Sequence, residues 1–345
     1  MVRAFIVAVV LLASIPGVGG AVRAQQREPP TLRDEVKGST TRQSSPLATT
    51  AARQRQNQDD VIRVDTNLIT IPATVMDRDA RYITDLRKED FEIFEDGVQQ
   101  QVAFFASVEQ PFTILFLLDT SGSMSYRIDD LIRAANTFVI QLRPNDQLMI
   151  VSFDEWSKVL VKPTMVSDLK EGIKLSHTGD FTWLYDAVDH GLKRMRKVRG
   201  RKAIVVFSDG VNTGSSGTAK STLRTAQEQE ALIYTVQFDT YRRGPSRYGD
   251  DREYLKRVEK ANIYMKDLAQ KTGGRHYQIE NISDLEKTFG LVADELRRHY
   301  SLGYYPKTKL EPGQQRQIKV RVRQPNLVVR ARDSYTVSKE IAKGR

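Results

Sequence analysis

TILFLLDTSGSM, residues 113–124, is the stretch that decides the fold of this chain of 345 residues. Its first six residues are mostly apolar and too few for a buried helix, so they predict a central strand that is buried on both faces. Asp119, Ser121 and Ser123 follow at alternate positions, where an open α/β sheet binds ligands beyond the carboxyl ends of its strands. One carboxylate and two hydroxyls are hard oxygen donors, which suit magnesium or manganese better than zinc or copper. Gly122 is expected to permit the tight turn that brings them together.

Around this stretch, residues 111–299 alternate between apolar strands and amphipathic helices. This alternation predicts an α/β fold, a Rossmann-like, doubly wound and mostly parallel sheet with helices on both faces. The predicted strands lie at residues 113–118, 147–153, 203–207, 232–238 and 275–279. The predicted helices lie near residues 128–142, 184–198, 222–231, 253–271 and 283–299.

The segments on either side of this domain are β-rich. Residues 61–110 predict short strands, with Pro72 favouring an edge position or a bulge and Asp96-Gly97 favouring a hairpin turn. Residues 61–110 are too few to form a full β-sandwich alone. Residues 300–337 return to alternating apolar and polar positions, so we expect both segments to complete one β-sandwich-like module into which the α/β domain is inserted. Residues 338–345 are expected to be a disordered tail.

The N-terminal residues are typical of an exported protein. Residues 1–24 combine a short basic start, an apolar core and a small-residue stretch, which predicts a signal peptide cleaved before Gln25 and no transmembrane segment afterwards. The alternative is an uncleaved membrane anchor, although the apolar run is short for a bilayer. Residues 25–60 have few large apolar residues and predict a disordered linker. We therefore expect the protein in the periplasm, at the cell surface or in the medium.

Composition excludes several other classes of protein. The formal net charge is +10, but the basic residues are scattered except at residues 193–202, where they end a predicted helix and face its dipole favourably. This distribution, together with export, argues against nucleic acid as a partner. The chain has no cysteine, which excludes a disulfide framework and a thiolate metal site.

Two further polar residues are expected at the same edge of the sheet. Thr182 directly precedes a predicted helix, so it is either a site residue or the N-cap of that helix. Asp209 ends another buried strand in Ser208-Asp209-Gly210, and its alternative is a turn residue bonded to its own backbone. Thr178 is the competing threonine, but the residues after Thr182, LYDA, favour Thr182.

Taken in order, DTSGSM after an apolar strand, a later threonine and SDG after another strand resemble the von Willebrand factor type A domain. The resemblance covers roughly residues 111–299. The flanking segments VDTNLITIPATVMDRDARYITDLRKEDFEIFEDG (64–97) and HYSLGYYP (299–306) are similar to the bacterial, exported branch of that family.

This resemblance implies a metal-ion-dependent adhesion site whose ligands, direct or through water, are Asp119, Ser121, Ser123, Thr182 and Asp209. The implied ion is magnesium, with manganese or calcium as alternatives, and an acidic side chain of a protein partner completes its coordination. Three neutral hydroxyls and two carboxylates would leave the ion able to accept another anionic oxygen. We expect Asp119 to lie beyond the buried part of its strand, so that its replacement leaves the sheet intact.

The function expected from the sequence is therefore a cation-dependent adhesion or assembly module and not an enzyme. The alternative is a structural scaffold of the cell envelope in which the ion is absent or only stabilising. A Ser-His-Asp hydrolase built on Ser208 is disfavoured, because the chain lacks a G-x-S-x-G nucleophile elbow. The sequence names no particular partner and assigns no oligomeric state.

Overall fold

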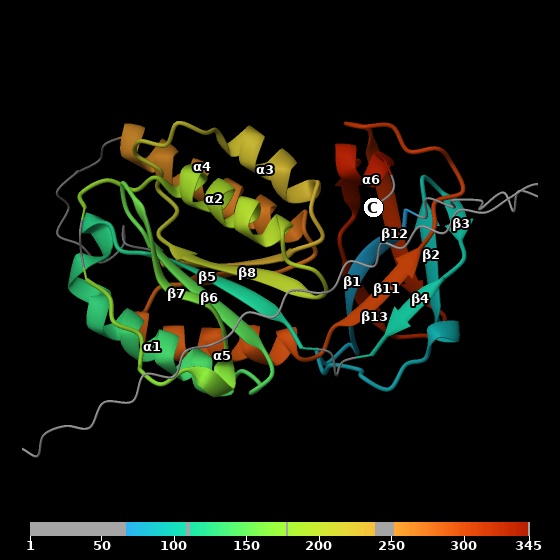
Figure 1. The fold of residues 1–345 in the computed structure, drawn as a ribbon, viewed down its shortest axis with the longest axis horizontal. Coiled ribbons are helices and arrows are strands. Elements are labelled where there is room, and N and C mark those ends of the chain that lie inside the picture. The colour runs from blue at the N-terminus through green and yellow to red at the C-terminus, as the bar shows by residue number, and fades with distance from the viewer. Residues whose placement is uncertain (1–66, 108–110, 177–178, 239–251, 344–345) are drawn as a thin grey trace, which may run out of the picture. The chain divides into compact units, whose positions relative to one another are not determined.

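The computed structural model describes residues 67–107, 111–176, 179–238 and 252–343, and all of them belong to one compact unit that spans residues 62–345. The expected signal peptide (1–24) and linker (25–60) lie outside the described residues. Within the described part, the strands form three sheets, one of six strands and two of four (Figure 1). None of the helices in that part is both long enough and apolar enough to cross a bilayer.

The six-stranded sheet has the strand order β10-β9-β8-β5-β6-β7. Its pairs are parallel except the last, in which β7 runs antiparallel to β6. All seven residues of β5 are buried, because β8 and β6 flank it and helices cover both faces. The strands are β5 (Thr113–Asp119), β6 (Gln147–Phe153), β7 (Ser157–Met165), β8 (Lys202–Ser208), β9 (Leu232–Phe238) and β10 (His276–Ile279).

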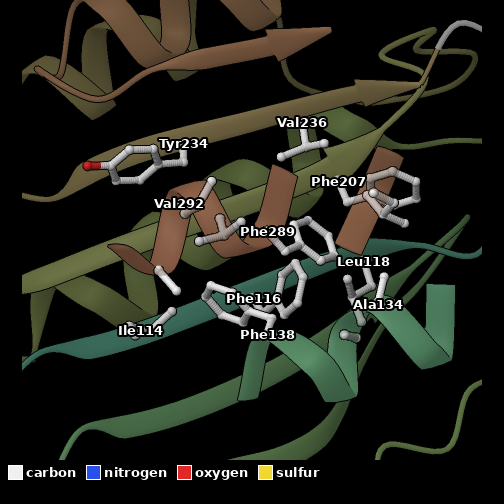
Figure 2. Packing of buried hydrophobic residues seen from close by; sticks show 14 of the residues in the cluster. Ile114, Phe116, Leu118, Ala134, Phe138, Phe207, Tyr234, Val236, Phe289 and Val292 are labelled. Carbon is white, nitrogen blue, oxygen red and sulfur yellow. The ribbon is translucent and has the colours of Figure 1, made fainter. Parts of the chain in front are cut away.

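Each face of this sheet has its own hydrophobic core, because successive side chains of a strand point to opposite faces. On one face Phe116 packs between Phe138 and Phe289, with ring centroids 5.1 and 4.9 Å away (Figure 2). That face is covered by α1 (Ile128–Gln141) and α5 (Leu285–Leu296), and the other by α2 (Leu184–Arg196), α3 (Ala219–Gln227) and α4 (Arg252–Gln270) (Figure 1). The predicted α/β architecture is confirmed.

The two four-stranded sheets form the β-module. One has the order β13-β1-β11-β4 and the other β14-β12-β2-β3, and their buried residues make one shared core. Strands β1 and β11 pair antiparallel although the whole α/β domain lies between them in the chain, which agrees with the predicted insertion. The strands are β1 (Ile69–Met76), β2 (Phe91–Glu95), β3 (Val98–Gln100), β4 (Phe104–Ala106), β11 (Tyr300–Tyr304), β12 (Gln315–Val322), β13 (Val328–Ala331) and β14 (Ser334–Thr336).

Pro72 lies in an interior strand and not in an edge strand, although its own position has a neighbouring strand on one side only. Strand β1 lies between β11 and β13. The partner β13, however, pairs only with residues 73–76, while Pro72 pairs with Ser301 of β11. The proline therefore occupies the half of β1 that has a neighbour on one side only, where its missing N–H costs no ladder hydrogen bond.

The chain end also differs from the expectation of a disordered tail. A short helix, α6 (Lys339–Lys343), follows β14. Its residue Ile341 is buried in the core of the β-module. A single apolar side chain in a charged stretch is a weak sequence signal for a helix. Helix α6 is stabilised by its contact with the β-module and not by its local sequence.

The α/β domain and the β-module do not share a hydrophobic core but meet through polar contacts. Glu295 of α5 is fully buried and pairs with Arg330 of β13. The hydroxyl of Tyr234 donates to Glu295 Oε1 (2.8 Å) and lies 3.1 Å from Nε2 of the buried His299. Arg332 donates to the carbonyl oxygen of Gln229, just beyond α3, at 3.0 Å.

Candidate metal site

The loop after β5 folds tightly around the carboxylate that ends the strand. The backbone N–H of Ser121 donates to Asp119 Oδ1 at 3.0 Å. The hydroxyl oxygens of Ser121 and Ser123 lie 3.3 Å apart, and a 3-10 helix, η2 (Gly122–Arg127), begins between them. The alternate spacing of the motif thus brings one carboxylate and two hydroxyls together, as the sequence predicted.

The backbone conformation at position 122 does not require a glycine, contrary to the expectation from the sequence. Its φ lies outside the left-handed region, and a Cβ there would meet the carbonyl oxygen of Asp180 at 3.5 Å, which is an ordinary contact. The turn is therefore made by the hydrogen bond to Asp119 and not by glycine's conformational freedom. The backbone of Gly122 nevertheless approaches the loop that carries Thr182.

Asp119 is fully buried, and the expectation that it lies beyond the buried part of its strand is wrong. It is the last residue of β5 and lies in register with Phe153 of β6. On the other side the hydroxyl of Ser208, at the end of β8, donates to Asp119 Oδ2 at 2.5 Å. The exposure of a strand end depends on how far its neighbours extend, and both neighbours extend as far as Asp119.

Asp209 follows β8, and its carboxylate makes a turn contact and also acts on Asp119. Its Oδ1 accepts from the backbone N–H of Val211 at 3.0 Å, as a turn residue would. Its charge also acts on Asp119: burial, and then repulsion from Asp209, raise the pKa of Asp119 to about 7. Two carboxylates that disfavour each other's ionised form are stabilised together by a cation between them.

Thr182 is brought to the same edge of the sheet by backbone contacts. Its N–H donates to Thr213 Oγ1 at 2.7 Å, and its carbonyl accepts from the N–H of Thr213 at 2.9 Å. An isolated bridge between Ser121 and Gly179 joins this loop to the loop after β5. The N-cap of α2 is Trp183, so the capping alternative for Thr182 is wrong. Thr178 lies outside the described residues.

The chemistry of this donor set fits a hard divalent cation. In the part of the chain that the structure describes, no three or more His, Cys, Asp or Glu side chains gather as metal ligands, so the candidate site depends on hydroxyl oxygens beside two carboxylates. Such a set suits magnesium, which takes few protein ligands and keeps several waters. It offers no soft donor for zinc or copper.

Ser208 is the residue whose role sequence reasoning missed. It is fully buried, donates to Asp119 and accepts from the N–H of Gly210 at 2.9 Å. The sequence signal that could have indicated this role is a hydroxyl residue at the last position of β8, the strand next to β5. In this position Ser208 holds the Asp119 carboxylate and is not presented as a nucleophile. Asp154, at the end of β6, accepts from the N–H of Trp156 at 2.8 Å, as a turn residue.

Comparison with protein families matches residues 114–212 to the von Willebrand factor type A domain. This segment runs from β5 to the loop after β8 and contains all five candidate ligands. No curated protein matches the chain.

Solved structures give remote matches to the chain. BatB from Bacteroides thetaiotaomicron has 17% identity and a TM-score of 0.38, with 54% of this chain and 98% of that chain covered. The vWF domain of the type V pili tip protein Mfa5 from Porphyromonas gingivalis has 13% identity and a TM-score of 0.40, with 53% and 94% covered. The ArnB paralog VWA2 from Sulfolobus acidocaldarius has 14% identity and a TM-score of 0.42, with 79% and 76% covered.

Proposed function

Residues 114–212 match the von Willebrand factor type A domain, and we propose that this chain is a non-enzymatic module that binds a protein partner through a divalent cation. The ion is magnesium, and its ligands, direct or through water, are Asp119, Ser121, Ser123, Thr182 and Asp209. The partner supplies a carboxylate. The result of this capture is adhesion or assembly outside the cytoplasm.

The observation that carries this proposal is the pairing of a buried carboxylate with a second one beside a cluster of hydroxyls. Asp119 is fully buried and feels the charge of Asp209, while Ser121 and Ser123 place their hydroxyl oxygens 3.3 Å apart beside it. A bound divalent cation would offset this negative charge and attract an anionic oxygen from outside. Asp119 and Asp209 would anchor the ion, and the neutral hydroxyls would keep its affinity for that oxygen high.

Two features of the chain hold the site steady for such a task. Ser208 and the Ser121 N–H fix both oxygens of Asp119. The Thr182 loop is tied to Thr213 by hydrogen bonds from both backbone groups of Thr182. A site whose ligands are already oriented loses little entropy when it binds, which favours affinity for ion and partner alike.

The exported location is proposed from the N-terminal sequence alone, in which residues 1–24 have the three-part form of a signal peptide. Intact-mass analysis of the protein recovered from its host would test this proposal. A mature chain that begins near Gln25 is expected, whereas a membrane-bound chain that retains Met1 would indicate an anchor.

The binding function is tested by capture from an envelope extract on immobilised protein. Capture of a partner is expected with magnesium, should be lost with a chelator and should return when magnesium is restored. Asp119→Asn, with a fold verified by circular dichroism, serves as the control and should capture nothing under any of these conditions. Capture that persists in chelator and with Asp119→Asn would contradict the proposal and favour the scaffold alternative.

A further inference from the structure

Three aromatic residues lie in two loops that adjoin the loop of the candidate metal site, and we call them the aromatic rim: Trp156, Phe181 and Trp183. Trp156 is 75% exposed and Phe181 is 54% exposed, while Trp183 is half-buried. Trp156 and Trp183 are the two tryptophans of the chain. Large aromatic side chains exposed together on a folded protein are typical of binding surfaces.

The rim borders the candidate site on two of its loops. Trp156 lies in the turn between β6 and β7, three residues after Phe153, the residue in register with Asp119. Phe181 directly precedes Thr182 in the chain. A group that binds at the ion would therefore have aromatic surface beside it.

The two tryptophans of the rim are also held in place before any partner arrives. The rings of Trp156 and Trp183 lie 5.8 Å apart at 45°. The N–H of Trp183 donates to the carbonyl of Asp154 at 2.9 Å, and the N–H of Trp156 donates to the carboxylate of the same residue at 2.8 Å. A Cβ at Gly214 would collide with Trp183 Nε1, so this indole packs directly on the glycine.

Two acidic residues lie next to the aromatic rim and affect which partners can bind there. Glu155 and the exposed Asp180 flank the aromatic residues, and the N–H of Asp180 donates to the Glu155 carboxylate at 3.3 Å. Acidic neighbours oppose an acidic partner unless a cation bound at the site offsets them. The rim can thus add apolar contact to an interaction whose carboxylate is selected by the ion.

We infer that the aromatic rim binds a large apolar side chain next to the carboxylate that the ion captures. The partner segment is then a protein segment with an Asp or Glu adjacent to an aromatic or branched aliphatic residue. This inference rests on the proposed function, because the ion supplies the first contact. Burial of such a side chain against Trp156 and Phe181 strengthens binding by about tenfold or more.

Three blocked synthetic peptides test this inference. One has a single Asp flanked by Phe in a Gly background, the second has the same Asp flanked by Gly, and the third replaces Asp by Asn in the Phe-flanked peptide. Binding is measured with magnesium by calorimetry and by tryptophan fluorescence, which reports only on the rim because both tryptophans belong to it. The Phe-flanked Asp peptide should bind about tenfold more tightly than the Gly-flanked one, and the Asn peptide should not bind.

The variants Trp156→Ala and Phe181→Ala should each reduce this tenfold preference while leaving the thermal stabilisation by magnesium intact. Ile140→Ala is the matched control, because Ile140 is an 83% exposed apolar residue near the end of α1, away from the rim. It should change neither property. Asp119→Asn should lose both the magnesium response and the binding of every peptide.

The two proposals fail in different ways. If magnesium stabilises the protein but the Phe- and Gly-flanked peptides bind equally, or neither binds, the rim inference is wrong and the metal site stands. If magnesium has no effect on the wild-type protein, the metal site is wrong and the rim inference fails with it. A fluorescence response to a neutral oligosaccharide, with none to the peptides, would also overturn the inference, because it would assign the rim to stacking on sugars.

Discussion

Ser208 supports Asp119 at the level of a single hydrogen bond. We expect Ser208→Ala to lower magnesium affinity by about 10- to 100-fold, because residues that orient a metal ligand have effects of this size. It should cost stability too, since the N–H of Gly210 loses its acceptor. Calorimetric titration with magnesium measures the affinity, and urea unfolding measures the stability. An affinity equal to that of the wild type would show that Ser208 has no part in orienting Asp119.

His299 makes the stability of the junction dependent on pH. Burial lowers the pKa of His299 to about 4, although the Glu295 carboxylate opposes this shift; Tyr234, Arg201 and Arg330 are its other charged or titratable neighbours. Because the ordinary histidine pKa is about 6.5, the unfolded chain binds a proton between about pH 6.5 and pH 4 that the folded chain does not. Stability conferred by neutral His299 is therefore complete above pH 6.5 and is lost as the pH falls through this window.

The expected loss at pH 5 is about 2 kcal/mol of unfolding free energy relative to neutral pH. Urea unfolding at both pH values measures it. The variant His299→Gln, which cannot take up this proton, should lose less stability over the same interval by about that amount. Identical pH profiles for the wild type and His299→Gln would assign the acid sensitivity to another group.

The clustering of the candidate ligands could be predicted from the residues themselves, but their burial could not. Alternate spacing after an apolar strand was sufficient to place Asp119, Ser121 and Ser123 together. The burial of Asp119 was missed because it depends on where β6 and β8 end, which no local pattern states. The aromatic rim was missed for a related reason, since the sequence does not distinguish an exposed Trp156 from a core tryptophan.

At the scale of elements, the end of α4 is closely fitted to the β-module. Gly273 has a φ of +88°, and a Cβ there would lie 2.9 Å from the backbone nitrogen of Arg332. Gly200 has a similar φ of +81° with nothing within 4 Å of an added Cβ, which makes it a matched control. Gly200→Ala should cost about 1 to 2 kcal/mol from backbone conformation alone, and Gly273→Ala should cost clearly more. Urea unfolding of both variants measures the difference, and equal losses would contradict a tight contact between α4 and the β-module.

The buried elements were predictable because their apolar period is imposed by the core they form. Strand β5 shows this most clearly. Its apolar residues belong alternately to the core on the α1 face and to the core on the opposite face of the sheet. Short elements held by a distant contact were not predictable. Helix α6 has one buried side chain, Ile341, and its stability depends on a core that the local sequence does not contain.

At the scale of the whole molecule, the two parts of the chain have separate hydrophobic cores. Every residue of both clusters on the six-stranded sheet lies within 112–296, and every residue of the β-module cluster lies outside that range. A fragment of residues 111–299 should therefore fold and retain the proposed magnesium site. Deletion of residues 300–345 should instead leave β1 and β2 without β11 and β12, exposing strand edges that aggregate. Size-exclusion chromatography distinguishes these outcomes, and a monomeric, folded truncation would count against the shared β-module.

Magnesium-dependent thermal stabilisation tests the proposed divalent-cation site around Asp119 most directly. Wild-type protein in chelator should gain stability as magnesium is added, by about 2.7 kcal/mol at a concentration 100-fold above the dissociation constant. Asp119→Asn keeps the size and shape of the side chain but removes its charge, so it should show no gain. A wild-type protein that does not respond to magnesium, or an Asp119→Asn variant that responds equally, would contradict a cation site at Asp119.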